Sequence, residues 1–401
     1  MMFLFSKDRK NYGAQQPKRT FFIKIWWGWL VVCGEGTFYN GGDESQKQEV
    51  VAMHGGWWWM VLAGIVSAGV KLGCWCYGNT HWWVKEMRRI EALGVQERQA
   101  VLVNGHVINY AELGGEGPAL LLIHGQMGAW QDYAAVMPQL SQQWHVYAVD
   151  VYGHGGSSHE EALYYLDVNG EDLIAFIEQE IGAPVVVSGH SNGALLAAYM
   201  AAYGGRWVRG ALLEDPPVFS TEGEDWEKTF AYIDTYAPLH AYLSSSQKEC
   251  WPAYYLRHCY WGQLFMKPVM PFLANYAQWT ARRHPDEEVK MPFLPRSITC
   301  MFHHVGQYDM LYGEHFYDLT WSRGVRHAHM LADIAVPCVY LHAKETISPE
   351  GVLFCAASRA QAERAVALIG DNAALIETPD SDHNIHGKHT ALYLEALSRL
   401  L

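Results

Sequence analysis

The five residues Gly189-His190-Ser191-Asn192-Gly193 constrain the fold of this chain more than any other feature of its sequence. The apolar run Pro184–Ser188 before them predicts a buried strand, and the small-residue stretch from Ala194 onward predicts a helix. A chain that passes from strand to helix over so few residues must turn sharply, and glycines permit this because they carry no Cβ. Such a turn would lift Ser191 above the sheet as an exposed nucleophile, beside the positive end of the helix dipole.

From residue 100 onward, short apolar runs alternate with helical stretches. Asn104-Gly105, between Val101–Val103 and Val107–Leu113, predicts a tight hairpin. Six apolar runs are typical of buried parallel strands: Ala119–Ile123, Val146–Val149, Pro184–Ser188, Ala211–Leu213, Cys338–Leu341 and Ala374–Ile376. Helices are predicted between and after them: Tyr133–Gln142, Asp172–Ile181, Ala194–Tyr203, Ser358–Ile369 and Thr390–Leu400. This alternation predicts an α/β fold, with a mostly parallel central sheet and helices on both faces.

Three further motifs accompany the serine motif. His124-Gly125-Gln126 follows one predicted strand, the glycine-rich loop Asp150–Ser157 follows the next, and Ser381-Asp382-His383-Asn384-Ile385-His386 precedes the final helix. In this order and at this spacing, the four motifs resemble those of the α/β-hydrolase fold family. The resemblance covers roughly residues 100–401 and implies a serine hydrolase of that fold, which needs neither a metal nor a cofactor.

The resemblance also implies a role for each matched residue. Ser191 would attack a carbonyl carbon, with His383 as the general base. The backbone N–H groups of Gln126 and Asn192 would form the oxyanion hole. His383 is preferred to His386 as the base because it aligns with the histidine of the family's loop.

The acid of the triad has two candidates. The family usually carries an aspartate after its seventh strand, but here that stretch is His342-Ala343-Lys344-Glu345-Thr346, where Glu345 is the only carboxylate. Some members instead carry the acid in an Asp-Pro pair after the sixth strand, which Asp215-Pro216 resembles. Asp215 is slightly favoured, and Glu345 remains the alternative.

Residues 218–332 interrupt the alternation where the family inserts its cap. This segment is rich in aromatic residues, which has two interpretations: a lid that shapes an apolar pocket, or an ordinary cap core. The aromatic residues are Tyr232, Tyr236, Trp251, Tyr254, Tyr255, Trp261, Phe265, Phe272, Tyr276 and Trp279. The predicted hydrolase core then consists of residues 99–217 and 333–401.

The amino-terminal region differs from the rest of the chain, since nine of the 17 tryptophans lie in its first 83 residues. Residues 1–56 are predicted as a basic, irregular extension, and Met53 offers an alternative translation start.

Residues 57–78 are apolar except for Lys71 and have aromatic residues at both ends, which predicts one transmembrane helix that anchors the protein in a membrane. Residues 79–98 are predicted as a linker. The basic residues on the two sides of the span leave its orientation open.

The net charge of −13 argues against a nucleic-acid-binding protein. The sequence as a whole predicts a membrane-anchored serine hydrolase that cleaves a hydrophobic carboxylic ester or related acyl bond through an acyl-enzyme intermediate. A carbon–carbon bond hydrolase or a lactonase would use the same triad, and a non-catalytic binding protein with a broken triad is the alternative of another class. The sequence leaves the natural substrate and the oligomeric state open.

Overall fold

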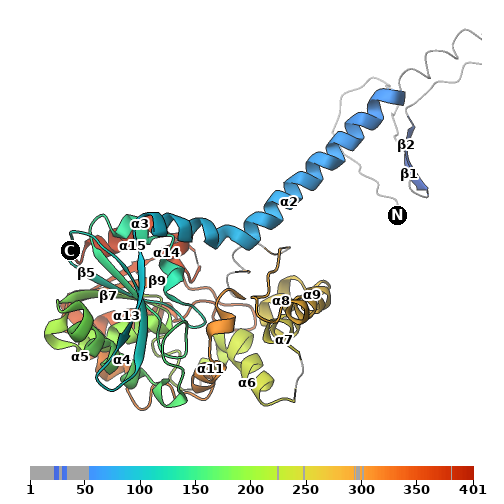
Figure 1. Ribbon diagram of the computed structural model, residues 1–401. Coiled ribbons are helices and arrows are strands. Elements are labelled where there is room, and N and C mark those ends of the chain that lie inside the picture. The colour runs from blue at the N-terminus through green and yellow to red at the C-terminus, as the bar shows by residue number, and fades with distance from the viewer. Residues whose placement is uncertain are drawn as a thin grey trace, which may run out of the picture. The chain divides into compact units, whose positions relative to one another are not determined.

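The structure is a computed structural model (Figure 1). It describes strands 22–26 and 29–33 and residues 54–401, apart from positions 224, 247–248, 293, 295–298, 300–301 and 381. The chain divides into two compact units, Met1–Val70 and Lys71–Leu401. In the first unit, β1 (Phe22–Trp26) and β2 (Trp29–Cys33) pair as an antiparallel hairpin within the predicted extension 1–56. The rest of that extension up to residue 53 lies outside the described residues.

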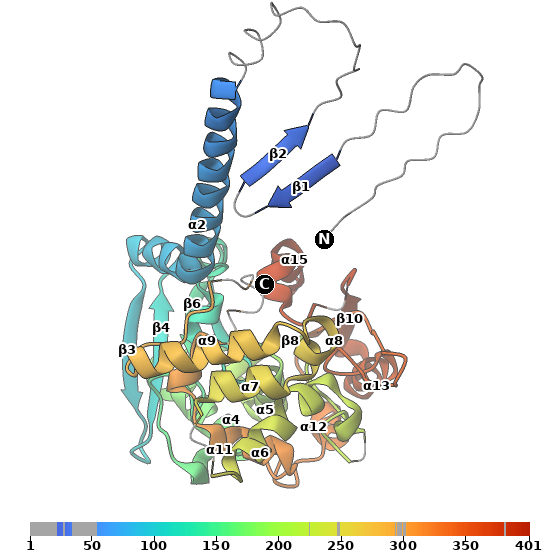
Figure 2. The same ribbon diagram turned by 90° about the vertical axis from the view of Figure 1, so that its right-hand side faces the viewer.

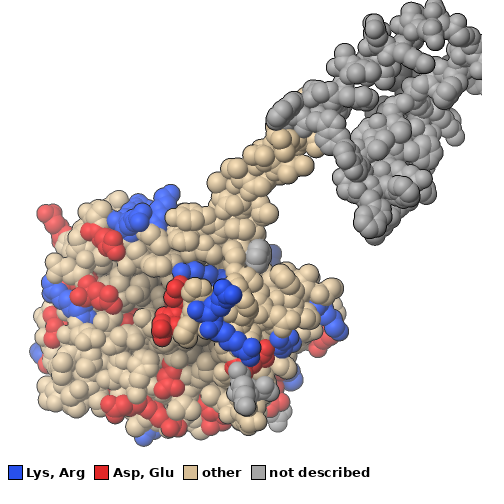
Figure 3. Space-filling model, turned by 45° about the vertical axis from the view of Figure 1, so that its right-hand side comes forward, with Lys and Arg blue, Asp and Glu red and all other residues tan. Residues whose placement is uncertain are grey.

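One helix, α2 (His54–Ala92), contains the whole predicted span. Its segment Met60–Ala92 is long and apolar enough to cross a membrane, with a mean hydropathy of 1.5 in its most apolar window and none of that window buried. The apolar part of this helix that follows the grey residues is almost uniformly tan in Figure 3.

The prediction of a linker at 79–98 was wrong, because α2 continues to Ala92 and a strand begins at Gln96. The reason is amphipathic spacing. Trp83, Met87 and Ile90 recur at helical intervals, Ile90 is fully buried in the hydrophobic core beneath the sheet, and Met87 packs against that core.

The second unit contains an eight-stranded sheet in the order β10-β9-β8-β7-β5-β6-β4-β3 (Figure 2). Six neighbouring strands are parallel: β5 (Ala119–Ile123), β6 (His145–Val149), β7 (Val185–His190), β8 (Val208–Glu214), β9 (Cys338–His342) and β10 (Ala373–Glu377). The remaining two, β3 (Gln96–Val101) and β4 (Val107–Leu113), add an antiparallel hairpin at one edge. The predicted α/β fold is confirmed.

Alternate residues of the parallel strands point into two separate cores. Leu121 and Ile123 of β5 face α4 (Leu166–Phe176), α5 (Asn192–Tyr203) and α13 (Arg359–Ile369). Leu120 and Leu122 face the other layer, which contains α3 (Met137–Leu140), α14 (Ile385–Lys388), α15 (Thr390–Ser398) and the end of α2. Both faces of the sheet are therefore covered by helices, as parallel strands require.

Several predicted elements differ in extent, and the helix predicted at Asp172–Ile181 is α4 followed by a π-helix, Ile177–Ile181. The helix predicted at Tyr133–Gln142 is a 3₁₀ turn, Trp130–Tyr133, followed by the short α3. Pro138 lies in the first turn of α3 and lacks a backbone N–H, so a helix begins there instead of running through it. The first hairpin strand lies at Gln96–Val101 instead of Val101–Val103 because it is an exposed edge strand, where polar residues replace the apolar run of a buried strand.

The segment between β8 and β9, predicted as a cap at 218–332, forms helices that lie beyond the carboxyl ends of the strands (Figure 1). They are α6 (Ala237–Leu243), α7 (Trp251–His258), α8 (Tyr260–Phe265), α9 (Met270–Arg283) and α11 (Met310–Tyr317). The last helix of the segment, α12 (His327–Ala332), packs against α5 and α13. Short 3₁₀ and π turns connect several of them.

Candidate active site

The turn between β7 and α5 holds Ser191 in a strained backbone conformation, with φ 57° and ψ −121°. A non-glycine residue in such a conformation costs on the order of 1–3 kcal/mol, and this strain concentrates at functional sites. The glycines around Ser191 permit the turn: a Cβ on Gly193 would lie 2.4 Å from the carbonyl oxygens of Ile123 and His124. The local fold predicted from the sequence motif is therefore present.

The His124-Gly125-Gln126 loop approaches this turn closely. A Cβ on Gly125 would lie 3.3 Å from the Cβ of Ser191, which brings the loop to van der Waals distance. Within the described residues, the backbone N–H of Gln126 has no hydrogen-bond acceptor. Asn192 begins α5, so its N–H has no acceptor inside the helix. Both groups predicted to form the oxyanion hole are thus free donors, from two segments that meet at Ser191.

Both polar atoms of the Gln126 side chain form hydrogen bonds. Its Nε2 donates to the hydroxyl of Tyr308, and its Oε1 accepts from the hydroxyl of Tyr236, both residues of the cap. The backbone next to it is anchored as well, because the N–H of Met127 donates to His154 Nε2 over 3.2 Å. The cap therefore determines the position of the Gln126 side chain.

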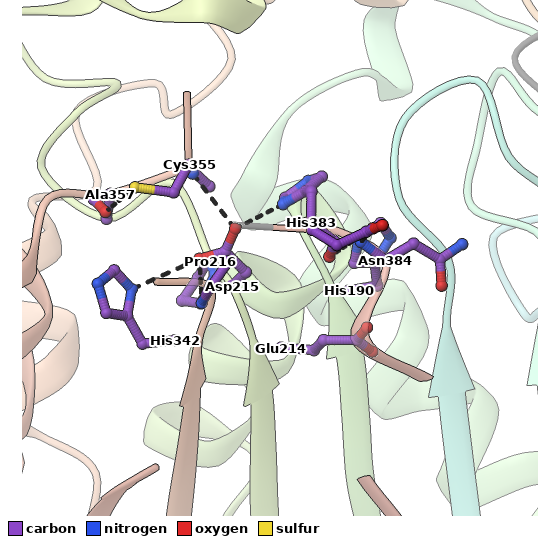
Figure 4. Close-up of polar contacts among 12 residues, drawn as sticks. His190, Glu214, Asp215, Pro216, His342, Cys355, Ala357, His383 and Asn384 are labelled. Atoms are coloured by element: carbon purple, nitrogen blue, oxygen red, sulfur yellow. Dashed lines mark hydrogen bonds and ion pairs between the residues drawn. The ribbon is translucent and has the colours of Figure 1, made fainter. Parts of the chain in front are cut away.

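His383 pairs with Asp215 at the end of β8 (Figure 4). His383 Nδ1 lies 2.6 Å from Asp215 Oδ2, an arrangement that leaves Nε2 available to a substrate or to Ser191. The carboxylate is fully buried and accepts hydrogen bonds from the N–H groups of Ala343 and Ala356, each over 3.2 Å. His342 Nδ1 lies 3.6 Å from Asp215 Oδ1 on its other side.

These contacts shift both pKa values in the direction that a catalytic pair needs. Burial alone would raise the pKa of Asp215, but the imidazoles of His342 and His383 outweigh it and lower that pKa to about 2. Burial alone would lower the pKa of His383, but the hydrogen bond to Asp215 and its charge outweigh burial and raise that pKa. Asp215 is thus ionised at neutral pH and holds the imidazole in one orientation.

The other candidate acid, Glu345, is not brought to His383. Its Oε2 accepts a hydrogen bond from the backbone N–H of Arg359 over 2.8 Å, near the start of α13. Of the two carboxylates predicted from the sequence, the structure therefore places only Asp215 in contact with His383.

A second histidine–carboxylate pair lies next to the first. His386 Nδ1 lies 2.9 Å from both carboxylate oxygens of Glu214, and its backbone N–H donates to Glu214 Oε1 over 2.8 Å. The backbone oxygen of Glu214 accepts the N–H of Ser191 over 2.9 Å. His190 Nε2 lies 3.1 Å from the backbone oxygen of His383. Sequence reasoning missed Glu214 and the contact made by His190, although both residues neighbour a predicted catalytic residue.

A cavity of about 360 Å³ opens above Ser191 and His383. Its walls are mainly apolar and aromatic, and they come from the cap and from the loop after β9. The lining residues are Ser191, Asn192, Pro217, Thr221, Trp226, Thr229, Phe230, Ala231, Tyr236, Phe316, Phe354, Cys355, Ala356, Asp382 and His383.

The cap aromatics named from the sequence fall into separate groups. Tyr236 lines the cavity, whereas Trp251, Tyr254, Tyr255 and Trp261 are buried within the cap. Three others, Phe265, Phe272 and Trp279, are exposed. Sequence reasoning missed the cavity residues Trp226, Phe230, Phe316 and Phe354. Their positions near cap and loop boundaries give no periodic signal that could distinguish them.

Several known proteins are similar to part of this chain. Lipase LipV of Mycobacterium tuberculosis is 34% identical over 122 residues, which cover 29% of this chain and 44% of the lipase. N-formylmaleamate deformylase of Pseudomonas putida is 34% identical over 119 residues, again covering 29% of this chain and 44% of the relative. A serine hydrolase-like protein of Homo sapiens is 25% identical over 140 residues, or 34% of this chain and 69% of that protein. The chain thus spans less than half the length of the lipase and of the deformylase.

Solved structures share the fold. An esterase from Exiguobacterium antarcticum superposes with a TM-score of 0.52 at 17% identity, over 76% of this chain and 99% of that one. A membrane phospholipase A superposes with a TM-score of 0.51 at 18% identity, over 85% and 97% of the two chains. The sequence model of the alpha/beta hydrolase family matches residues 120–396, which is more than half of the chain. The chain therefore belongs to the alpha/beta hydrolase family.

Proposed function

We propose that this protein is a serine hydrolase that cleaves a hydrophobic carboxylic ester, with Ser191, His383 and Asp215 as its triad. The observation that carries the proposal is the 2.6 Å contact between His383 Nδ1 and the buried Asp215 carboxylate. His383 lines the same cavity as Ser191, whose backbone is strained. A serine hydroxyl is a weak nucleophile, and a neighbouring base with an oriented imidazole activates it.

The reaction would proceed through two displacements. Ser191 Oγ attacks the carbonyl carbon while His383 Nε2 takes its proton, and the carbonyl oxygen becomes an oxyanion facing the N–H groups of Gln126 and Asn192. The C–O bond to the alcohol breaks as His383 returns the proton to the leaving oxygen, which leaves Ser191 acylated. Water, deprotonated by His383, then attacks the acyl carbon and releases the acid and Ser191.

The cavity supports a hydrophobic acyl or alcohol group. Trp226, Phe230 and Phe316 line the cavity together with Ser191 and His383, and few charged groups reach the lining. A cavity of about 360 Å³ lies at the lower end of the range for small-molecule sites. A lactone or a carbon–carbon bond substrate would meet the same three catalytic residues, so the substrate panel described below includes both.

A serine-directed fluorophosphonate probe tests the nucleophile. The wild-type chain should be labelled, Ser191→Ala should lose the label, and Glu345→Gln should keep it as a matched control. Absence of label on the folded wild-type protein would instead support a non-catalytic binding protein. A panel of p-nitrophenyl esters of graded acyl length, with a lactone and a vinylogous diketone, then identifies the substrate class.

We also propose that α2 anchors the hydrolase in a membrane. The support is its length, its apolar composition and the full exposure of its most apolar window. Trp75 and Tyr77 are exposed near the end of the apolar segment, where such side chains favour the interface between lipid and water.

A further inference from the structure

The turn that carries the Gln126 N–H is held by the core of the fold. The N–H of Gly128 donates to the carbonyl oxygen of Gly125 over 3.1 Å and closes a turn with Gln126 and Met127 at its centre. Met127 has φ 61°, a left-handed conformation that favours glycine, so the surrounding structure must hold it there. The N–H of Met127 is held because it donates to His154 Nε2 over 3.2 Å.

His124 holds the other peptide group of Gln126. Its Nδ1 lies 2.7 Å from the carbonyl oxygen of Gly125, and its Nε2 accepts the N–H of Val151 over 3.1 Å. Because Nε2 is an acceptor, Nδ1 carries the proton and donates it to the Gly125 carbonyl. The peptide groups before and after Gln126 are thus both anchored to the core, and neither anchor involves the Gln126 side chain.

The Gln126 carboxamide is bound by the cap instead. The hydroxyl of Tyr236 donates to its Oε1, and its Nε2 donates to the hydroxyl of Tyr308. Helix α11 packs closely against this contact, since a Cβ on Gly313 would lie 3.0 Å from Gln126 Nε2 and 2.5 Å from the Tyr308 hydroxyl. Tyr308 does not line the catalytic cavity, so its hydroxyl contacts Gln126 and not a substrate.

Both tyrosines are fixed by the packing of their rings. The ring of Tyr236 packs against that of Phe316, with the centroids 5.6 Å apart. The ring of Tyr308 lies 4.9 Å from that of His154. Their hydroxyls are therefore presented to the Gln126 carboxamide at defined positions.

A free carboxamide at this position would compete with the substrate. The N–H groups of Gln126 and Asn192 have no acceptor in the part of the chain that the structure describes, and they meet at Ser191. An amide oxygen accepts such N–H groups, and polar side chains bond to nearby backbone where other partners are lacking. Without the two hydroxyls, Gln126 Oε1 would be an unengaged acceptor on the same residue as one donor and on a loop that contacts the turn of the other.

We propose that Tyr236 and Tyr308 are positioning residues that keep the Gln126 carboxamide out of the oxyanion hole. They act through Gln126 and leave both N–H donors free for the carbonyl oxygen of the substrate. The inference rests on the proposed function for its kinetic test, and it assigns the cap a role in the chemistry besides shaping the cavity.

The test compares hydroxyl deletions in the full chain, with p-nitrophenyl butyrate as the substrate. Tyr308→Phe should lower kcat by about tenfold or more and leave KM nearly unchanged, because an occupied oxyanion hole impairs the transition state and not substrate binding. Tyr236→Phe should behave in the same way. Tyr242→Phe is the matched control, since the Tyr242 hydroxyl donates to the backbone oxygen of Glu249 within the cap and its loss should change neither constant.

Removal of the carboxamide separates this mechanism from damage to the cap. The double variant Tyr308→Phe/Gln126→Leu has no carboxamide that could enter the hole, so its kcat should rise above that of Tyr308→Phe and equal that of Gln126→Leu. A double variant as slow as Tyr308→Phe, or slower, would overturn the proposal. Wild-type kcat in both hydroxyl deletions would overturn it as well.

Amide hydrogen exchange in the full chain judges the proposal without an active enzyme. A carboxamide in the hole would protect the N–H groups of Gln126 and Asn192, so both should exchange more slowly in Tyr308→Phe than in the wild type. Adding Gln126→Leu should remove this difference. Faster or unchanged exchange at these two amides would overturn the proposal, whereas a wild-type chain inactive on every ester would refute the proposed function and leave this measurement valid.

Discussion

At the scale of single residues, substitutions of Asp215 and Glu345 are expected to have different effects on kcat/KM. Asp215→Asn replaces the ionised partner of His383 by an amide that no longer fixes the imidazole tautomer, so kcat/KM should fall by about 10⁴. Glu345→Gln should stay within about twofold of the wild type, because Glu345 contacts the backbone of Arg359 and not His383. Ester hydrolysis by both purified variants checks this. A large loss in Glu345→Gln with activity retained in Asp215→Asn would reverse the assignment.

The pH dependence of kcat/KM should reflect the contact between His383 and Asp215. The base must be neutral to accept a proton, and Asp215 raises the pKa of His383 above its ordinary value of 6.5. The acidic limb of kcat/KM should therefore have its midpoint above pH 6.5, with activity lost as the pH falls through it. His386→Gln should leave the position of the limb nearly unchanged. A wild-type midpoint at or below pH 6.5 would contradict the proposed coupling.

The contact between Glu214 and His386 is expected to contribute to the free energy of unfolding. Burial would raise the pKa of Glu214, but His386 outweighs it and lowers that pKa, while Glu214 raises the pKa of His386, so the pairing favours the charged form of each group. His386→Gln leaves the fully buried carboxylate without its cation, and the free energy of unfolding should fall by about 3–5 kcal/mol. The double variant Glu214→Gln/His386→Gln carries no buried charge and should recover part of this loss.

Urea unfolding followed by circular dichroism measures all three proteins. If the single variant unfolds at the same urea concentration as the wild type, the pair contributes nothing to stability. If the double variant is no more stable than the single one, the loss comes from packing and not from the unpaired charge.

At the scale of helices and strands, the sequence predicts buried elements well and exposed ones poorly. The run Ala119–Ile123 is apolar at every position because both faces of β5 are covered, and its predicted bounds match the structure. β3 has five of its six residues exposed. Its sequence is therefore polar, includes Arg98, and lacks the apolar pattern from which a strand is predicted. Ser191 and His383 follow from motifs. The choice of Asp215 does not, because it depends on which loop brings a carboxylate to His383 across 168 residues of sequence.

The second half of α2 should stabilise the catalytic unit, since its residue Ile90 is fully buried beneath the sheet. Ile90→Ala removes that apolar contact and should lower the free energy of unfolding by about 2–5 kcal/mol. Leu93→Ala is the control, because Leu93 is 53% exposed just beyond the end of the helix and should change stability by less than about 0.5 kcal/mol. Equal, small effects of both changes would restore the interpretation of residues 79–98 as a linker.

At the scale of the whole molecule, the chain combines a long apolar helix with an alpha/beta hydrolase fold whose cavity is lined by aromatic residues. Each feature favours a substrate that dissolves in lipid, and the two features are independent, because none of the residues that line the cavity belongs to α2. Anchoring would therefore raise the local concentration of substrate and leave the chemistry at Ser191 unchanged. This separates two measurable properties: where the protein is found and how fast it hydrolyses a soluble ester.

The anchor is tested by placing charges in the middle of the apolar segment. Ile65→Arg together with Val66→Asp should move the full chain from the membrane pellet to the supernatant of an alkaline carbonate wash, because each charge at the centre of a membrane helix costs about 2.5–3.5 kcal/mol. Both wild-type side chains are exposed, at 64% and 55%, so neither change disturbs a buried contact. Hydrolysis of p-nitrophenyl acetate per mole of protein should stay within about twofold, because the triad lies entirely outside α2. A double variant that remains in the pellet with the wild type would show that α2 is not the anchor.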